Sequence, residues 1–301
     1  MSKTVPSIDG IIEQSQLPAL PQSAVSLLRI SQDPDVGPVE FAAPIEADIG
    51  LTSQILRFVN SSYFGFAREI GSIRHAIALV GVRTIKNFAL WNAVFSLIPD
   101  PKCGPFRLKS LWQDSLRRAL FARAVSRSLS LENAEDVFAS TLLQDMSLPI
   151  LAKHMSNEYE QLFNQRDGGR RRMSDLEADL FGWNHAAVGA RLIGQWGLPE
   201  HFGELIESHT NDINELVREG NADRAIVALS AMLPSAQDEH WYERDNAIDQ
   251  FEALSQRGVP DLIQLFDQVD REFDDFAPLL KLPASIRSLG DFLRTEGELA
   301  F

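Results

Sequence analysis

Apolar residues recur along this chain at the spacing of an α-helix. Leu51, Ile55, Phe58 and Val59 fall at positions i, i+4, i+7 and i+8, which places them on one helix face. Asp48 precedes this stripe and is suited to cap the helix, because its carboxylate can accept a free backbone amide of the first turn. No stretch alternates apolar and polar residues as a half-buried strand does. The pattern predicts an all-α protein.

Capping residues predict further helix boundaries. Ser72 and Gly81 bracket a short apolar helix, and Asn184 precedes another apolar stripe. Ser174 and Glu177 have the spacing of a capping box, in which each side chain bonds the other residue's backbone amide. We therefore expect helices to begin after Ser72, Ser174 and Asn184.

Two segments interrupt the helical pattern. Residues 99–105 contain three prolines and a glycine, and proline breaks a helix because it lacks the amide proton. Residues 167–172 combine two glycines with Arg170, Arg171 and Arg172. These arginines are candidates for contact with an anion or a partner, although loop arginines are usually solvated.

Composition and charge narrow the class of protein. The 301 residues are 45% hydrophobic, with no signal-peptide pattern, no apolar run long enough to span a membrane, and a single Cys103. We therefore expect a cytoplasmic protein without a membrane segment. The net charge of −14 arises in residues 200–301, which carry 22 acidic and 8 basic side chains, a difference of 8 − 22 = −14. Such an acidic region repels phosphate backbones, so we expect no direct contact with nucleic acid.

Seven short motifs follow one another between residues 17 and 199. They are Leu17-Pro18-Ala19-Leu20-Pro21, Asn60-Ser61-Ser62-Tyr63-Phe64-Gly65, Ile70-Gly71-Ser72-Ile73-Arg74-His75, Leu111-Trp112-Gln113-Asp114-Ser115, Gln144-Asp145, Phe181-Gly182-Trp183-Asn184-His185 and Trp196-Gly197-Leu198-Pro199. In this order they resemble the HDOD domain, the HD-related output domain of bacterial signalling proteins. The resemblance covers about residues 17–210 and implies a multi-helix fold, in which an N-terminal helical group packs on a degenerate HD-type bundle.

The resemblance also implies a division of the chain. An N-terminal segment, 1–16, precedes the HDOD domain, 17–210. That domain comprises a helical group (17–98), the proline-rich connector (99–105) and an HD-like part (106–210), and the acidic helical region 211–301 completes the bundle. Because neither helical group can bury its apolar stripes alone, we expect groups 17–98 and 106–210 to form one body with a concave seam.

The metal site of HD phosphohydrolases is mostly replaced here. The resemblance places the first His at Asp114, the His-Asp pair at Gln144 and Asp145, and the last Asp at Ala231. Only Asp145 is unchanged, and Gln144 and Ala231 are poor or impossible metal ligands. We therefore expect no catalytic residue, no bound metal and no cofactor. An unmetallated Asp145 should instead accept hydrogen bonds from the Gln144 amide or from an arginine, because a buried charge must be paired.

Two histidines allow a different outcome. His185 and His209 stand where the phosphodiesterase branch of the superfamily has extra ligands, so Asp114, Asp145, His185 and His209 together could hold one weakly bound cation. The preferred interpretation is a non-catalytic signalling module that binds an unidentified signalling protein, with its oligomeric state open. The alternatives are a metal-dependent phosphohydrolase acting on a cyclic dinucleotide or nucleotide, and an inactive pocket that binds a nucleotide effector.

Overall fold

All regular elements in the described part of the chain are helices, which confirms the predicted all-α class. The computed structural model describes residues 6–14, 20–30, 37–61, 64–256, 258–283 and 287–297. Motif residues 17–19 and 62–63 lie outside these ranges. Among the described residues, no helix combines the length and the apolar character that crossing a bilayer requires. The described chain divides into two compact units.

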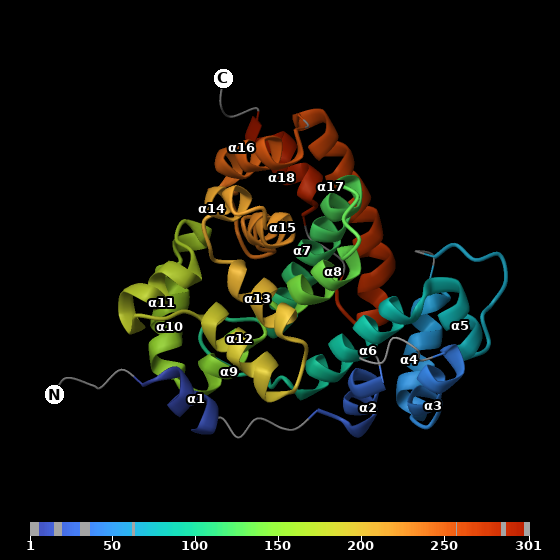
Figure 1. Ribbon diagram of the computed structural model, residues 1–301. Helices are drawn as coiled ribbons and strands as arrows, with labels where there is room; N and C mark the ends of the chain where they lie inside the picture. Colours follow the sequence, from blue (N-terminus) through green and yellow to red (C-terminus); the bar gives the residue numbers. More distant parts are fainter. Residues whose placement is uncertain are drawn as a thin grey trace. The chain divides into compact units, whose positions relative to one another are not determined.

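The first unit comprises residues 1–17, 98–271 and 285–301. Its helices are α1 (Ile8–Gln14), α7 (Leu108–Ser128), α8 (Ala134–Leu143), α9 (Ser147–His154), α10 (Ser156–Gln165), α11 (Met173–Phe181), α12 (His185–Gln195), α13 (Glu200–Ser208), α14 (Ile213–Arg218), α15 (Ala222–Ala231), α16 (Arg244–Ser255), most of α17 (Val259–Phe276), α18 (Leu289–Gly297) and the 3₁₀ turn η1 (Asp167–Gly169). Helices α7, α8, α13 and α15 pack against one another at its centre (Figure 1).

Helix α7 forms the middle of this unit. Between residues 111 and 126 every residue except Arg118 is buried. Several of these buried side chains are polar or charged, among them Asp114, Arg117 and Arg123. Buried charges need partners, so this helix has to collect hydrogen bonds from the elements packed around it.

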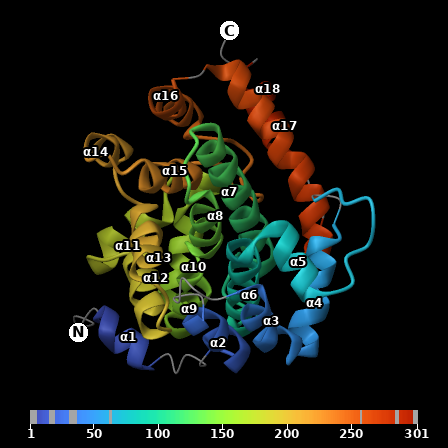
Figure 2. The same ribbon diagram turned by 45° about the vertical axis from the view of Figure 1, so that its right-hand side comes forward.

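The second unit comprises residues 18–97 and 272–284. It contains α2 (Gln22–Ile30), α3 (Pro38–Glu46), α4 (Ile49–Val59), α5 (Ile73–Val80), α6 (Val82–Leu97), the last turn of α17 and the 3₁₀ turn η2 (Ala277–Leu280). Helices α3, α4 and α5 lie side by side (Figure 2). Phe58 stacks on Phe88 with ring centroids 4.1 Å apart and contacts Phe276 at 5.5 Å, so the end of α17 contributes to this core. The expectation that groups 17–98 and 106–210 form one body stays a prediction.

Three predicted helix starts are confirmed by their caps. The Asp48 carboxylate accepts a hydrogen bond from the Leu51 amide at 3.0 Å, at the start of α4. The Ser72 hydroxyl caps α5, which ends at Gly81 with φ of +85°. The Asn184 side chain accepts from a first-turn amide of α12 at 3.2 Å. Each cap is a local interaction, which is why the sequence alone predicts it.

The predicted capping box of Ser174 and Glu177 is wrong. Helix α11 begins one residue earlier, at Met173, and its N-cap residue is Arg172. Glu177 is completely buried and turns away from the helix start toward Tyr159 and His185. A buried carboxylate must be hydrogen-bonded, and these partners on two other helices satisfy it.

Candidate functional site

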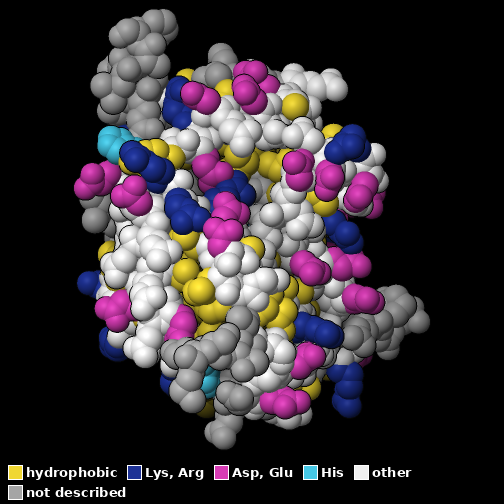
Figure 3. Space-filling view, turned by 90° about the vertical axis from the view of Figure 1, so that its left-hand side faces the viewer, with side chains coloured by type: hydrophobic (Ala, Val, Ile, Leu, Met, Phe, Trp, Pro, Cys, Tyr) yellow, Lys and Arg dark blue, Asp and Glu magenta, His cyan; other side chains and the backbone are white. Residues whose placement is uncertain are grey.

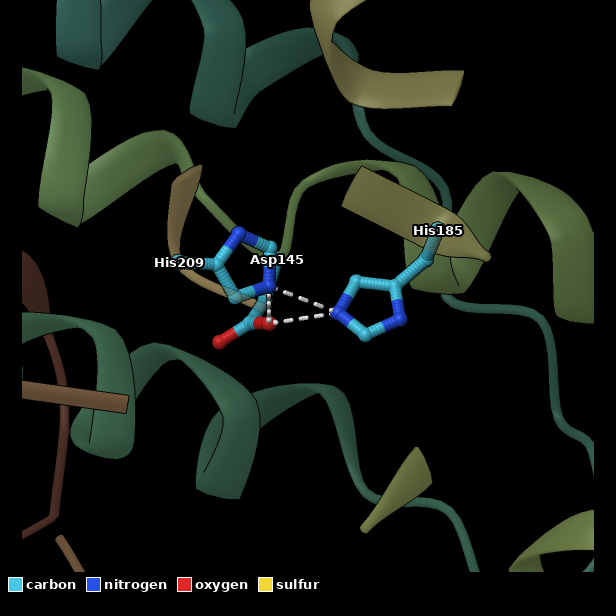
Figure 4. A group of neighbouring side chains, drawn as sticks. All are labelled: Asp145, His185 and His209. Atoms are coloured by element: carbon cyan, nitrogen blue, oxygen red, sulfur yellow. Dashed lines mark hydrogen bonds and ion pairs between the residues drawn. The ribbon is translucent and has the colours of Figure 1, made fainter. Parts of the chain in front are cut away.

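Asp145, His185 and His209 converge at one point in the first unit (Figure 4). His185 Nε2 lies 2.9 Å from His209 Nε2 and 3.2 Å from Asp145 Oδ1. His209 Nε2 lies 3.5 Å from the same carboxylate oxygen. All three residues are buried, and among the described residues they form a group whose ligand atoms could hold a metal ion.

Local structure explains why these side chains meet. Asp145 lies in the tight turn between α8 and α9, directly after the C-cap residue Gln144. Asn184 caps α12, so His185 is the first helical residue and its side chain leaves the helix end. His209 directly follows the last residue of α13. The Ser147 hydroxyl donates to the His185 carbonyl at 2.7 Å, which ties α9 to the start of α12.

The outer nitrogen of each imidazole is held by an acceptor. His185 Nδ1 lies 2.6 Å from Glu177 Oε2, which also accepts from the His185 backbone amide at 2.8 Å. The Tyr159 hydroxyl donates to the other oxygen of Glu177 at 2.7 Å. His209 Nδ1 lies 2.5 Å from the Ile206 carbonyl oxygen. Since a carbonyl can only accept, His209 carries its proton on Nδ1 and presents the Nε2 lone pair to the cluster.

The electrostatics assign the protons within the cluster. Burial opposes protonation of His185, but Glu177 and Asp145 outweigh it and raise its pKa to about 10. Burial, with the neighbouring His185, lowers the pKa of His209. His185 is therefore the charged donor and His209 the neutral acceptor in the contact between their Nε2 atoms.

Asp145 has the arginine partner expected from the sequence. Arg118 Nη1 lies 2.6 Å from Asp145 Oδ2, and the Gln144 amide approaches the same oxygen at 3.4 Å. Burial alone would raise the pKa of Asp145, but the Arg118 charge and the hydrogen bond from His185 hold it well below its ordinary value. The two carboxylate oxygens thus have different partners: Oδ2 contacts Arg118, and Oδ1 faces the two imidazoles.

Asp114 does not join the cluster. Its Oδ2 accepts from the Ser235 hydroxyl at 2.5 Å and its Oδ1 from the Ala236 amide at 2.6 Å. Burial raises its pKa, against the opposing effects of Arg118 and these hydrogen bonds. In place of a ligand, this position provides a tether for the loop that follows α15. Ala231, where the resemblance places the last HD Asp, lines the cavity without offering a ligand atom.

A cavity of about 300 Å³ opens onto the cluster. The carboxylates among its lining residues are Asp114, Asp145, Asp238 and Glu243. Asp238 accepts from Arg166 at 3.1 Å and from the Ser235 amide at 2.9 Å, and Glu243 accepts from Arg172 at 2.6 Å. All four are therefore engaged within the chain.

The predicted contact arginines also have partners within the chain. Arg170 lies over the Tyr242 ring at 5.1 Å, and Arg171 pairs with Asp179 at 2.8 Å. Arg172 and Arg166 connect the 166–172 segment to the loop that follows α15, and both line the cavity. Gly169 permits this close approach, because a Cβ there would meet the Asp238 carboxylate at 2.6–2.7 Å.

The structure thus brings together three of the four residues considered from the sequence as a weak cation site. Asp145, His185 and His209 meet, whereas both oxygens of Asp114 are occupied elsewhere. Sequence reasoning missed Glu177 and Arg118 as parts of the site. Arg118 had a signal, since it follows Asp114 by four residues and so shares its helix face.

Comparisons with known proteins agree with this fold. A solved HDOD domain protein of unknown function from Geobacter sulfurreducens matches with a TM-score of 0.73 at 22% identity, covering 90% of this chain and 97% of that one. A candidate signal transduction protein from Marinobacter aquaeolei VT8 matches with a TM-score of 0.68 at 18% identity, covering 90% of this chain and 60% of that one. A candidate phosphohydrolase from Shewanella amazonensis SB2B matches with a TM-score of 0.62 at 18% identity, covering 96% and 94%.

Sequence comparison identifies the family. A protein of Treponema pallidum (strain Nichols), itself uncharacterised, is 25% identical over 203 residues; the match spans 65% of this chain and only 38% of the relative. The profile of the HDOD domain matches residues 17–212, close to the range over which the motifs suggested it. The chain belongs to the HDOD domain family.

Proposed function

We propose that the chain is a non-catalytic signal-transduction module that acts by binding another protein. The observation that carries this proposal is that all four carboxylates lining the cavity already accept hydrogen bonds within the chain. Hydrolysis of a phosphoester needs a base that activates water and cationic groups that stabilise the charged phosphate. The carboxylates that line the cavity are engaged by hydrogen bonds, and Arg118, Arg166 and Arg172 each pair with one of them.

The replaced HD positions support the same proposal. Asp114 is committed to the loop after α15, Gln144 is neutral and Ala231 has no donor atom. The relative from Marinobacter aquaeolei is a candidate signal transduction protein, which fits a regulatory role. The Shewanella amazonensis relative is a candidate phosphohydrolase and names the alternative that an assay must exclude.

The acidic character of residues 200–301 favours a partner with a basic surface. Acidic side chains exceed basic ones there by 14, from 22 and 8. On the face of the molecule in Figure 3, acidic and basic side chains are interspersed around a group of hydrophobic ones. Electrostatic attraction between an acidic surface and a basic partner is screened by salt, so association should weaken as ionic strength rises.

A hydrolysis assay tests the non-catalytic part. The full chain is incubated with cyclic dinucleotides, nucleotides and a chromogenic phosphomonoester in the presence of Mn²⁺, Fe²⁺ or Mg²⁺. We expect rates equal to those of Asp145→Asn, with Asp179→Asn as an exposed control. Hydrolysis by the wild-type chain and by Asp179→Asn that is absent in Asp145→Asn would establish an enzyme instead.

Co-purification from the native host tests the binding part. The tagged chain is used as bait at low and at high salt, with bound proteins and bound nucleotides identified separately. We expect a protein whose recovery falls at high salt. Recovery of a nucleotide alone would favour the effector-pocket alternative.

A further inference from the structure

We propose that Asp145, His185 and His209 bind one divalent transition-metal ion through Oδ1 and the two Nε2 atoms. These atoms come from the α8–α9 turn, the start of α12 and the end of α13, and they face a common point in Figure 4. Their separations are 2.9, 3.2 and 3.5 Å. The proposal reverses the sequence-based expectation of no bound metal, and its ligands are three of the four residues considered from the sequence for a weakly bound cation.

The separations fit the coordination shell of such an ion. Bonds of about 2.0–2.1 Å at tetrahedral angles place donor atoms about 3.3–3.4 Å apart. The two distances to Asp145 Oδ1, 3.2 and 3.5 Å, bracket that value. Only the two imidazole nitrogens, at 2.9 Å, have to separate, by about 0.4 Å. A rotation of either ring by a few degrees provides this separation, and the ion displaces the proton on His185 Nε2, which is released to solvent.

The surrounding contacts are those that orient metal ligands. Metal-binding imidazoles commonly donate their other N–H to a carboxylate or a backbone carbonyl, which directs the remaining lone pair at the metal. Here Glu177 holds Nδ1 of His185 and the Ile206 carbonyl holds Nδ1 of His209. Tyr159 in turn fixes Glu177.

The donor set selects the class of ion. Two imidazoles and one carboxylate suit Fe²⁺, Co²⁺, Ni²⁺ or Zn²⁺, whereas Mg²⁺ and Ca²⁺ prefer oxygen ligands. Asp145 can serve as a single-oxygen ligand, since Arg118 holds its other oxygen. The three residues also line the cavity, so the remaining coordination positions are accessible to water or to an anionic group.

The binding itself does not depend on the proposed function, but the role of the ion does. If the module is non-catalytic, the ion cross-links the α8–α9 turn to α12 and α13 and makes the stability of this region depend on metal. Binding or loss of the ion then changes how firmly these helices are held together, and with it the surface available to a partner protein. This regulatory role rests on the proposed function.

Titration with Co²⁺ tests the site directly. The full chain is stripped with a chelator, and Co²⁺ is added while visible absorbance is recorded, because four-coordinate Co²⁺ absorbs far more strongly than the hydrated ion. We expect a spectrum that saturates at one Co²⁺ per chain, disappears when Zn²⁺ is added and is unaffected by excess Mg²⁺. A linear, unsaturated response would overturn the proposal.

Matched variants locate the ion. His185→Gln and His209→Gln should abolish the saturable spectrum, whereas His154→Gln, at an exposed position, should leave it unchanged. Glu177→Gln leaves all three ligands in place and should weaken binding about 10–100-fold, the usual effect of losing an orienting partner. Circular dichroism verifies folding of each variant. Equal Co²⁺ affinity in His209→Gln and the wild type would place the ion elsewhere and refute the site.

The outcomes separate this proposal from the proposed function. A saturable site together with phosphoester hydrolysis would retain the metal and refute the non-catalytic module. An absence of Co²⁺ binding together with an absence of hydrolysis would refute the metal site and leave the non-catalytic module in place.

Discussion

Replacing Asp145 by alanine should be among the most destabilising substitutions in the first unit. The side chain of Asp145 is 5% exposed and that of its partner Arg118 is 15% exposed, and they are joined at 2.6 Å. Removing one member of a buried ion pair leaves an uncompensated charge and costs about 3–5 kcal/mol. His185 loses an acceptor in the same change, at 3.2 Å. We expect the free energy of unfolding to fall by about 3–5 kcal/mol.

The same contact predicts a pH dependence. The pKa of Asp145 is lower in the folded chain than its unfolded value of about 3.9. Its ionised form therefore stabilises the fold above that value, and the contribution is lost as pH falls below it. Asp145→Asn preserves the volume but cannot ionise, so this part of the acid dependence should disappear in that variant.

Urea unfolding at pH 7 with a chelator present measures these effects without contribution from metal. Asp179→Ala is the matched control, because Asp179 is 72% exposed in its pair with Arg171 and should change stability by less than about 0.5 kcal/mol. If Asp145→Ala proves no less stable than this control, the charge of Arg118 is solvated and the buried-pair reasoning fails. Parallel unfolding curves between about pH 5 and pH 3 for Asp145→Asn and wild type would contradict the pH argument.

Two further substitutions test the contacts around the site. Tyr159→Phe removes the 2.7 Å hydrogen bond to the Glu177 carboxylate. It should lower the free energy of unfolding, measured by urea titration, by about 1.5–3 kcal/mol. An unchanged urea midpoint would show that water replaces the hydroxyl. Asp238→Ala leaves Arg166 and the Ser235 amide without their acceptor and should lower the free energy of unfolding by about 1–3 kcal/mol. The loop after α15 should also be cleaved faster by a protease. Equal cleavage rates in variant and wild type would show that Asp238 does not hold this loop in place.

Local interactions made most of the fold predictable from the sequence. Asp48, Ser72 and Asn184 cap helices because each side chain reaches an amide three residues away, and this geometry depends on nothing distant. The apolar stripe from Leu51 to Val59 likewise predicts its own helix, α4, in which all four stripe residues are buried. The motif order added the family, since seven short patterns in sequence are more specific than any one of them.

Long-range pairing made the site harder to predict. Glu177 has the right spacing from Ser174 for a capping box, yet its partners are Tyr159 on α10 and His185 on α12. Periodicity and spacing carry no information about which helices will be neighbours. The same limit applies to the cluster, since Asp145 and His209 are separated by more than sixty positions in sequence and meet only after the bundle has formed.

Asp114, which the resemblance places at the first HD ligand position, illustrates why reversing one substitution should not restore an HD site. Asp114 accepts from the Ser235 hydroxyl and the Ala236 amide, and an imidazole cannot accept both hydrogen bonds in the same geometry. Asp114→His should therefore release the loop after α15 and lower the unfolding free energy by about 1–3 kcal/mol.

Asp114→His should also gain no phosphodiesterase activity, because Gln144 and Ala231 still supply no ligand and Arg118 still occupies one oxygen of Asp145. Ser235→Ala removes only one of the two donors to Asp114, so it should lie between wild type and Asp114→His in urea unfolding. If the urea midpoints fall in the order wild type, Ser235→Ala, Asp114→His, the loss of stability follows the number of hydrogen bonds lost to the loop. A general sensitivity of this position to substitution would not produce that order. A variant Asp114→His that is as stable as the wild type and hydrolyses a phosphoester would mean that Asp114 is a replaceable ligand, not a tether.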